Sequence, residues 1–185
     1  MHSGSITYDD YLNFFNLKII SSNFFNKDRV QPSSIDLTLS DECYEVISSF
    51  LSPYDQVRNK LKNFIKKKID LRNGFVLKKN STYIVKLNEN LYLPKNIFGK
   101  CNPKSTTGRL DIFCRTILNY CNEYEKIPYE YNGEMFLEIT SRAFDIYLRQ
   151  GDSLNQMRLV NNINNLLNDK ELFEYHNQNP IIFNN

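Results

Sequence analysis

The chain of 185 residues has few of the side chains from which protein zinc sites are built. Its two histidines, His2 and His176, lie near the two ends of the sequence, and neither begins a His-x-Glu motif. The four cysteines are Cys43, Cys101, Cys114 and Cys121. No two of them have the Cys-x-x-Cys spacing that completes the metal site of zinc-dependent base deaminases, so we expect no zinc bound by the protein.

Other absences exclude further classes of function. No Gly-x-Ser-x-Gly motif and no phosphate-binding P-loop motif occurs, and the two terminal histidines are poor members of a catalytic triad. A formal net charge of +2 provides no broad positive field for nucleic acid. No apolar run is long enough to cross a bilayer, and the opening MHSGSITYDD lacks the order of a secretory signal. We therefore expect a cytoplasmic protein with reduced, mostly buried thiols and with neither nucleic acid nor a membrane as a partner.

The composition is typical of one globular domain. Hydrophobic residues make up 41% and charged residues 24% of a chain long enough for a single core. We predict one domain over residues 1–185, with an N-terminal helical segment at 1–28 and a C-terminal helical tail at 160–185. Between Tyr8 and Phe25, apolar side chains recur at roughly helical spacing, which predicts a short helix.

Between these ends the pattern favours short strands. In residues 30–46, Ile35, Leu37 and Leu39 alternate with polar residues, which predicts a half-buried strand. Residues 55–71 return to helical or irregular character, and the basic run 66–68 is interpreted as a solvated helix face rather than a nucleic-acid contact. The apolar runs after Gly74 are FVLKK, STYIVKL, NLYLP, GRLDIFCRTI, EMFLEIT, FDIYLRQG and LNQMRLV. Their close spacing predicts a mainly β fold, either a barrel or a jelly-roll-like sandwich, with a few short helices.

One loop in this region concentrates polar chemistry. The stretch NPKSTTGRLD combines two cations, three hydroxyls and a glycine: Lys104, Ser105, Thr106, Thr107, Gly108 and Arg109. The hydroxyls, the first cation and the backbone N–H groups of such a turn are suited to cradling a phosphate chain, and Arg109 adds a fork for bidentate contacts. Taken alone, the same residues also fit a surface turn with an arginine salt bridge.

A lone carboxylate lies among apolar residues in the run EMFLEIT, residues 134–140. If this run is a strand, its odd-numbered residues face one way, whereas Phe136, Glu138 and Thr140 face the other. A glutamate that points into water is the common explanation. If the side chain is instead enclosed, the loss of water favours its protonated form, which suits a group that must take up and return protons.

The loop and the carboxylate belong to one family pattern. The segments VQPSSIDLTL, NPKSTTGRLDIF, YEYNGEMFLEIT and RQGDSLNQMRL occur in this order. They resemble the dCTP deaminase branch of the dUTPase-like superfamily, most closely the N-terminal half of its long, two-domain bacterial form. The resemblance runs from about Gln31 to the segment DKELFEYH, and it implies a dUTPase-like distorted β-barrel or jelly roll.

The resemblance also implies roles for particular residues. Ser105, Arg109 and Glu138 match the catalytic positions of the family. The positions that match nucleotide-binding residues are Lys104, Thr106, Thr107, Gly108, Tyr131, Phe136, Leu137 and Gln156. A homotrimer with active sites shared between subunits is a further implication, as is Mg²⁺ that arrives with the triphosphate of dCTP or dUTP and is held mainly by phosphate oxygens and water.

For a dCTP deaminase, these positions imply a reaction without protein-bound zinc. Glu138 takes a proton from the water that attacks C4 of cytosine, and it returns protons to N3 and to the departing ammonia. Ser105 orients the water. Arg109 holds the loop and balances the charge of the carboxylate.

Two other functions are compatible with the sequence. The first is a dUTPase, or a bifunctional enzyme that releases dUMP, although Pro128 stands where dUTPases place the aspartate that activates water. The second is a non-catalytic domain that binds nucleotide or completes a two-part enzyme. It is suggested by residues 168–185, which lack a clear version of the Tyr, Lys and Gln lid that covers the triphosphate in short family members.

Overall fold

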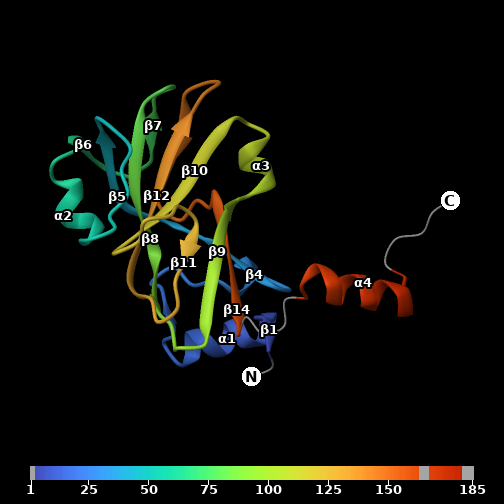
Figure 1. Cartoon of the computed structure of the whole chain (residues 1–185). Coiled ribbons are helices and arrows are strands. Elements are labelled where there is room, and N and C mark those ends of the chain that lie inside the picture. The colour runs from blue at the N-terminus through green and yellow to red at the C-terminus, as the bar shows by residue number, and fades with distance from the viewer. Residues whose placement is uncertain (1–2, 163–166, 181–185) are drawn as a thin grey trace.

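Two six-stranded antiparallel sheets form the body of the protein, which a computed structural model describes over residues 3–162 and 167–180 (Figure 1). The strands of the first sheet are β1 (Gly4–Ser5), β3 (Val30–Gln31), β4 (Ser34–Leu37), β9 (Ile97–Pro103), β11 (Lys126–Ile127) and β14 (Asn155–Asn161). Their hydrogen-bonded order is β11-β9-β14-β4-β3, and β1 pairs with β14. This order brings the end of β9, where the polar loop begins, beside β14.

The second sheet carries the strand with the lone carboxylate. Its strands are β2 (Ile20–Ser21), β5 (Leu39–Val46), β6 (Ile65–Asp70), β8 (Thr82–Tyr92), β10 (Ile112–Leu118) and β12 (Asn132–Ser141). The order is β10-β12-β8-β5-β6, and β2 pairs with β8. A separate ribbon pairs β7 (Phe75–Leu77) with β13 (Ile146–Leu148). The predicted mainly β fold is confirmed, although the strands of the described ranges leave both sheets open and form no closed barrel.

The helices are short. They are α1 (Tyr8–Asn16), the 3₁₀ turn η1 (Lys27–Arg29), α2 (Val57–Leu61), α3 (Ser105–Gly108) and α4 (Asp169–Gln178). A capping box of Thr7 and Asp10 begins α1. The chain leaves the helix at Lys18, whose φ of 58° is left-handed, so the helical spacing that runs on to Phe25 does not continue as helix.

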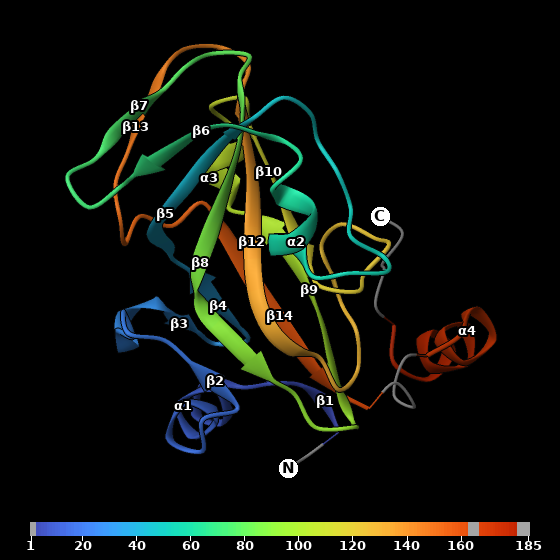
Figure 2. The same cartoon turned by 90° about the vertical axis from the view of Figure 1, so that its left-hand side faces the viewer.

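The C-terminal helix α4 lies apart from the sheets in both ribbon views (Figures 1 and 2). Asn168 and Glu171 form its capping box. Residues 1–2, 163–166 and 181–185, which belong to the predicted terminal segments, lie outside the described residues. Within the described ranges, no helix combines the length and the apolar character needed to span a bilayer.

The prediction for residues 55–71 is wrong in its second half. Val57 and Leu61 are buried within α2, but the helix ends there and residues 65–70 form β6. The lysine run 66–68 is therefore the exposed part of a strand at the edge of the second sheet. Charged side chains at a sheet edge discourage pairing with another chain. The solvated character was predicted correctly and the helix was not, because a short apolar spacing cannot distinguish the two structures.

Strand boundaries differ from the predictions in three other places. Residues 30–46 form three strands rather than one, whereas STYIVKL and NLYLP join to form the single strand β8. The segment 97–103, which forms β9, has no obvious strand pattern. Its central Gly99 allows the close approach of β14, because a Cβ there would lie 2.6 Å from the carbonyl oxygen of Arg158.

Two apolar clusters support these sheets. The larger fills the interior and includes Leu37, Leu87, Leu137 and Met157, all of them fully buried. The smaller lies on the other face of the second sheet and consists of Tyr44, Val46, Phe50, Val57, Leu61, Ile84, Ile117 and Phe136. Residues 47–64, including α2, cover this face (Figure 2). One face of β12 therefore packs in the main core, and the other lies beneath a separate covering segment.

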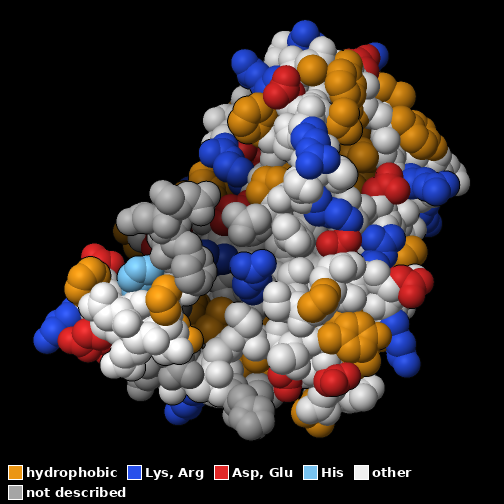
Figure 3. Space-filling model, turned by 90° about the vertical axis from the view of Figure 1, so that its right-hand side faces the viewer, with side chains coloured by type: hydrophobic (Ala, Val, Ile, Leu, Met, Phe, Trp, Pro, Cys, Tyr) orange, Lys and Arg blue, Asp and Glu red, His pale blue; other side chains and the backbone are white. Residues whose placement is uncertain are grey.

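Neither positive nor negative side chains predominate on the face of the molecule seen in Figure 3. Lys and Arg side chains are interspersed there with Asp and Glu, and apolar side chains gather in the upper part of the view. This agrees with the small net charge of +2 for the whole chain.

Candidate functional site

Glu138 lies in the middle of β12 and is enclosed. The register places it between Ile84 of β8 and Arg115 of β10. Only 4% of Glu138 is exposed. The interpretation as a glutamate pointing into water is therefore wrong for this side chain, because strands pair with β12 on both sides and residues 47–64 cover its face.

Arg115 on the neighbouring strand is the cation that pairs with this carboxylate. Its Nε and Nη2 atoms lie 3.1 and 2.5 Å from Oε1 of Glu138. The ring of Tyr124 lies 4.0 Å from the guanidinium carbon. In the sequence prediction Arg109 balances the carboxylate, whereas in this chain Arg115 occupies that place. Glu138 and Arg115 thus form a hydrogen-bonded ion pair between neighbouring strands.

A third group reaches the carboxylate from a distant part of the chain. Ser49, in the connection between β5 and α2, donates a hydrogen bond from Oγ to Oε2 of Glu138. The same Oγ lies 3.0 Å from Nη2 of Arg115 and 2.9 Å from the hydroxyl of Tyr124. Ser49, Arg115 and Tyr124 were not among the site residues predicted from the sequence. The pairing of β10 with β12 makes Arg115 a neighbour of Glu138, and no local pattern marks Ser49.

A hollow gives access to this carboxylate. It has a volume of about 430 Å³, and its lining residues are Phe113, Arg115, Glu138, Thr140 and Arg142. A second hollow of about 350 Å³ shares Phe113 and Arg115 with it and extends to Gly108 at the end of the polar loop. Two arginines beside one buried carboxylate suit a ligand that carries negative charge as well as a group able to exchange protons.

The polar loop forms the single helical turn α3 between β9 and β10. Thr107 is buried, and its Oγ1 donates to the carbonyl of Leu154 at 3.0 Å. Asp111, with a φ of 52°, lies between this turn and β10. The exposed residues of the loop are Ser105, Thr106, Gly108 and Arg109. One buried threonine thus anchors the turn and leaves most of the predicted ligand-binding residues at the surface.

Two of the predicted nucleotide-binding residues meet at one end of the first sheet. Lys104 forms an ion pair with Asp36 of β4. Gln156 of β14 is the register partner of the same Asp36 and of Asn102 on β9. Lys104 and Gln156 therefore lie beside one carboxylate, although they are far apart in the sequence.

This end of the first sheet does not contact Glu138 within one chain. In residues 3–162 and 167–180, no hydrogen bond or ion pair joins Ser105 or Arg109 to Glu138, whose polar partners are Arg115 and Ser49. The described chain thus has two separate groups of predicted site residues, one at the polar loop and one at Glu138. The two hollows beside these groups share residues Phe113 and Arg115 of β10.

Tyr131 stabilises the turn before β12. Its hydroxyl donates to the carbonyl of Glu134 at 2.5 Å and accepts from the backbone N–H of Asn119 at 3.2 Å. Burial raises the pKa of this phenol above its usual value. Tyr131 therefore holds the turn in shape as a neutral side chain.

Phe136 and Leu137 are both fully buried, but they face opposite sides of β12. Phe136 belongs to the smaller cluster on the face of Glu138, and Leu137 belongs to the main core. A nucleoside on the Glu138 face would thus meet Leu137 only through its backbone.

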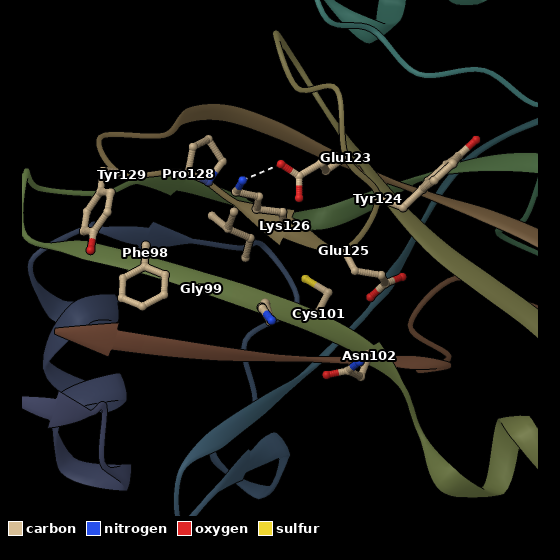
Figure 4. A pocket seen from close by; sticks show the side chains of 12 residues that line it. Phe98, Gly99, Cys101, Asn102, Glu123, Tyr124, Glu125, Lys126, Pro128 and Tyr129 are labelled. Carbon is tan, nitrogen blue, oxygen red and sulfur yellow. Dashed lines mark hydrogen bonds and ion pairs between the residues drawn. The ribbon is translucent and has the colours of Figure 1, made fainter. Parts of the chain in front are cut away.

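A larger hollow, of about 720 Å³, lies along β9 and β11 (Figure 4). Its wall includes Phe98 and Tyr129, whose ring centroids are 5.0 Å apart, as well as Pro128. Glu125 lines both this hollow and the one that reaches Gly108. Burial raises the pKa of the Glu125 carboxyl, although the carboxyl accepts a hydrogen bond from the backbone N–H of Thr116 at 2.8 Å.

The four cysteines are buried and unpaired. Burial raises the pKa of the Cys43 thiol to about 12, which disfavours the reactive thiolate. Across residues 3–162 and 167–180, no three His, Cys, Asp or Glu side chains are grouped in a way that could hold a metal ion.

Comparisons with known proteins identify similar sequences and structures. Residues 4–163 match the family described as the 2'-deoxycytidine 5'-triphosphate deaminase (DCD) N-terminal domain. Among solved structures, the chain is similar to 2'-deoxycytidine 5'-triphosphate deaminase from Agrobacterium tumefaciens, with 37% identity and a TM-score of 0.88 over 97% of this chain and 54% of that one. The chain thus spans about half the length of that protein.

More distant similarity extends to the dUTPase of EIAV, with 15% identity and a TM-score of 0.46 over 80% of this chain and 92% of that one. A comparison with curated proteins finds no match.

Proposed function

Because the chain belongs to the family of dCTP deaminase N-terminal domains, we propose that it catalyses the hydrolysis of dCTP to dUTP and ammonia. The observation that carries this proposal is the enclosed Glu138, which is paired with Arg115 and borders a hollow. Since the matched Agrobacterium protein is about twice as long, the activity of this half alone is part of the proposal.

In the proposed reaction Glu138 transfers each proton. The ionised carboxylate accepts a proton from water as the water oxygen bonds to C4 of cytosine, and the same proton passes to N3. The carboxylate then removes the proton of the new C4 hydroxyl and delivers it to the amino group. The C4–N bond breaks, ammonia leaves and a carbonyl forms at C4. Arg115 supports this cycle because its two hydrogen bonds to Oε1 hold the carboxylate beside the hollow.

The polar loop supplies the proposed binding site for the triphosphate. Lys104, Arg109 and the hydroxyls of the turn bind phosphate oxygens, and Ser105 orients the attacking water. Mg²⁺ enters as part of the substrate complex, coordinated mainly by phosphate oxygens and water.

A homotrimer would bring the two groups of site residues together. Ser105 and Arg109 do not contact Glu138 of their own chain, so we propose that they complete the site of a neighbouring subunit. Leu110, which follows the loop, and Phe113, which lines the hollow, have exposed side chains, at 49% and 61%, that this neighbour would cover. Sedimentation of the protein as a single-chain species at working concentrations would contradict this assembly.

The test is an assay of the purified chain with dCTP and Mg²⁺, in which dCTP, dUTP, dUMP and ammonia are resolved. We expect equal amounts of dUTP and ammonia, with rates unchanged by a zinc chelator. Release of dUMP and pyrophosphate from dCTP would instead show a bifunctional enzyme, and their release only when dUTP is supplied would show a dUTPase. Pro128 in the place of the water-activating aspartate counts against both. Saturable binding without turnover would show a nucleotide-binding half that needs a second part.

A further inference from the structure

We propose that Ser49 is a positioning residue that holds the Glu138 carboxylate in its reactive orientation, and that Tyr124 and Arg115 hold the Ser49 hydroxyl. This role rests on the proposed deamination. It is carried by the contacts among these four side chains, which come from the connection 47–56, β10, β12 and the residues before β11.

A glutamate needs such support because the torsion of its terminal carboxylate has no sharp intrinsic preference. Arg115 contacts only Oε1, through two nitrogens. Ser49 contacts Oε2. With each oxygen bound to a different residue, the plane of the carboxylate is defined, whereas removal of Ser49 would leave Oε2 free to rotate about the contact with Arg115.

The hydrogen bonds around Ser49 form a consistent set. A serine hydroxyl has one proton to donate and two lone pairs that accept. Its proton goes to Oε2 of Glu138, so the hydroxyl accepts from Nη2 of Arg115 at 3.0 Å and from the hydroxyl of Tyr124 at 2.9 Å. The one donor and both acceptor positions of the serine hydroxyl are therefore occupied.

This set also suits a carboxylate that gains and loses a proton. When Oε2 is protonated, it donates to Ser49 Oγ, and the serine proton turns toward the oxygen of Tyr124. The same four side chains then remain in contact in both protonation states, because two hydroxyls in sequence can reverse their direction of donation. An alanine at position 49 can neither donate a hydrogen bond to the ionised carboxylate nor accept one from the protonated carboxyl.

The backbone keeps Ser49 and Tyr124 together. Residue Ser52 forms a β-bridge with Cys121, and the N–H of Cys121 donates to the carbonyl of Ser52 at 3.1 Å. The connection that carries Ser49 is thus joined to the segment that carries Tyr124. The position of Ser49 over Glu138 is a property of two distant loops and not of β12 alone.

The test compares Ser49→Ala with Ser49→Thr and with Ser48→Ala in steady-state assays with dCTP. Ser48 is the matched control, because it is an exposed serine of the same loop whose Oγ donates to the carbonyl of Ser49 rather than to the carboxylate. We expect Ser49→Ala to lower kcat about 10- to 100-fold, with little change in KM, as for a lost hydrogen bond to a charged group. The threonine variant and Ser48→Ala are expected to retain most of kcat.

The pH profile provides a readout that loop damage alone would not move. Ser49 contacts the carboxyl in both protonation states, but its hydrogen bond to the charged form is the stronger one. Its removal should therefore shift the acidic limb of the kcat profile of Ser49→Ala to higher pH. An unchanged limb with kcat within twofold of wild type would overturn the proposal. An equal loss of kcat in Ser48→Ala would do the same.

A measurement without turnover separates this inference from the proposed function. The ¹³C signal of the Glu138 carboxyl carbon, assigned by its loss in Glu138→Gln, is followed against pH in wild type and in Ser49→Ala. We expect a higher titration midpoint in the variant, and identical midpoints would exclude the role of Ser49. If the two midpoints differ but the wild-type protein does not convert dCTP, the deaminase function is refuted and the role of Ser49 toward Glu138 stands.

Discussion

Two clusters of arginine and glutamate lie on the same face of the second sheet, and they use their charges differently. In one, Arg115 contacts the single carboxylate of Glu138. In the other, Arg58 of α2 bonds both oxygens of Glu42 and both oxygens of Glu134, at 2.5 to 2.9 Å. Both clusters border a hollow, of about 440 Å³ at Arg58 and about 430 Å³ at Arg115. An arginine shared by two carboxylates has few donors left for a ligand, whereas an arginine with a single carboxylate partner leaves that carboxylate and its hollow able to serve chemistry.

The Arg58 cluster is structural. It joins α2 to strands β5 and β12, and the guanidinium carbon of Arg58 lies 5.6 Å from the ring centroid of Phe136. Burial by itself raises the pKa of the Glu42 carboxyl, but the hydrogen bonds from Arg58 and Tyr44 and the positive charges nearby outweigh it and lower the pKa overall. The cluster therefore contributes stability in its ionised form and attaches the segment that covers the sheet.

The strongest test of this comparison exchanges one carboxylate from each cluster for an amide. Glu138→Gln removes the group that transfers protons, so we expect kcat for dCTP to fall by about 100-fold or more. Glu134→Gln, on the same strand and also bonded to an arginine, is the matched control and should retain kcat within a few-fold. Similar losses in both variants would mean that the two clusters do not differ in function.

The second test exchanges the arginines. Arg58→Ala removes the cation that Glu42 and Glu134 share, leaves Glu134 with the ion pair to Lys86, and releases α2. We therefore expect the free energy of unfolding to fall by about 2 kcal/mol, a figure reduced for the partial exposure of the side chain. Arg115→Ala should cost about 1 kcal/mol but should lower kcat more than Arg58→Ala does. Urea unfolding at pH 7 and the dCTP assay measure the two effects. A larger loss of stability in Arg115→Ala, together with a larger loss of kcat in Arg58→Ala, would contradict the assignment of the two clusters.

The smallest expected effect concerns a carboxylate of the main core. Glu89 is buried, and it accepts hydrogen bonds from the backbone N–H of Thr38 at 3.0 Å and from the Thr38 hydroxyl at 2.7 Å. Burial raises the pKa of its carboxyl. The stability that this group contributes is complete below the ordinary glutamate pKa and is lost as the pH rises through the raised value.

We therefore expect the free energy of unfolding of wild type, relative to Glu89→Gln, to decrease as the pH rises from about 4.5 to neutrality. Urea unfolding of both proteins across this range measures the difference. A parallel pH dependence in the two proteins would show that the carboxyl is ionised throughout. It would then behave like the carboxylates held by arginine.

Much of the fold was predictable because burial follows alternation along a strand. Ile35, Leu37 and Leu39 are buried as predicted, and Leu137 and Glu138 lie on opposite faces of β12. The errors occur where alternation is weak or short. The strand β9 contains a central glycine, and the lysine run of β6 has the composition of either a solvated helix or a strand edge.

The site was predictable only in part. The polar loop and Glu138 stand out because they place charge and hydroxyls among apolar runs. Ser49, Arg115 and Tyr124 do not stand out, because nothing in the local sequence distinguishes them from ordinary surface residues. Their contacts depend on the register of β10 against β12 and on the loop that crosses the sheet.

By itself, the sequence determined that this chain is a mainly β domain with a phosphate-suited loop and one carboxylate set among apolar residues, since side-chain chemistry and its period along the chain are local properties. Only the tertiary structure decided that the carboxylate is enclosed, that Arg115 rather than Arg109 of the same chain neutralises it, and that Ser49 fixes its second oxygen. Distances between strands and loops far apart in the sequence set these contacts, and such distances exist only after the sheets have paired.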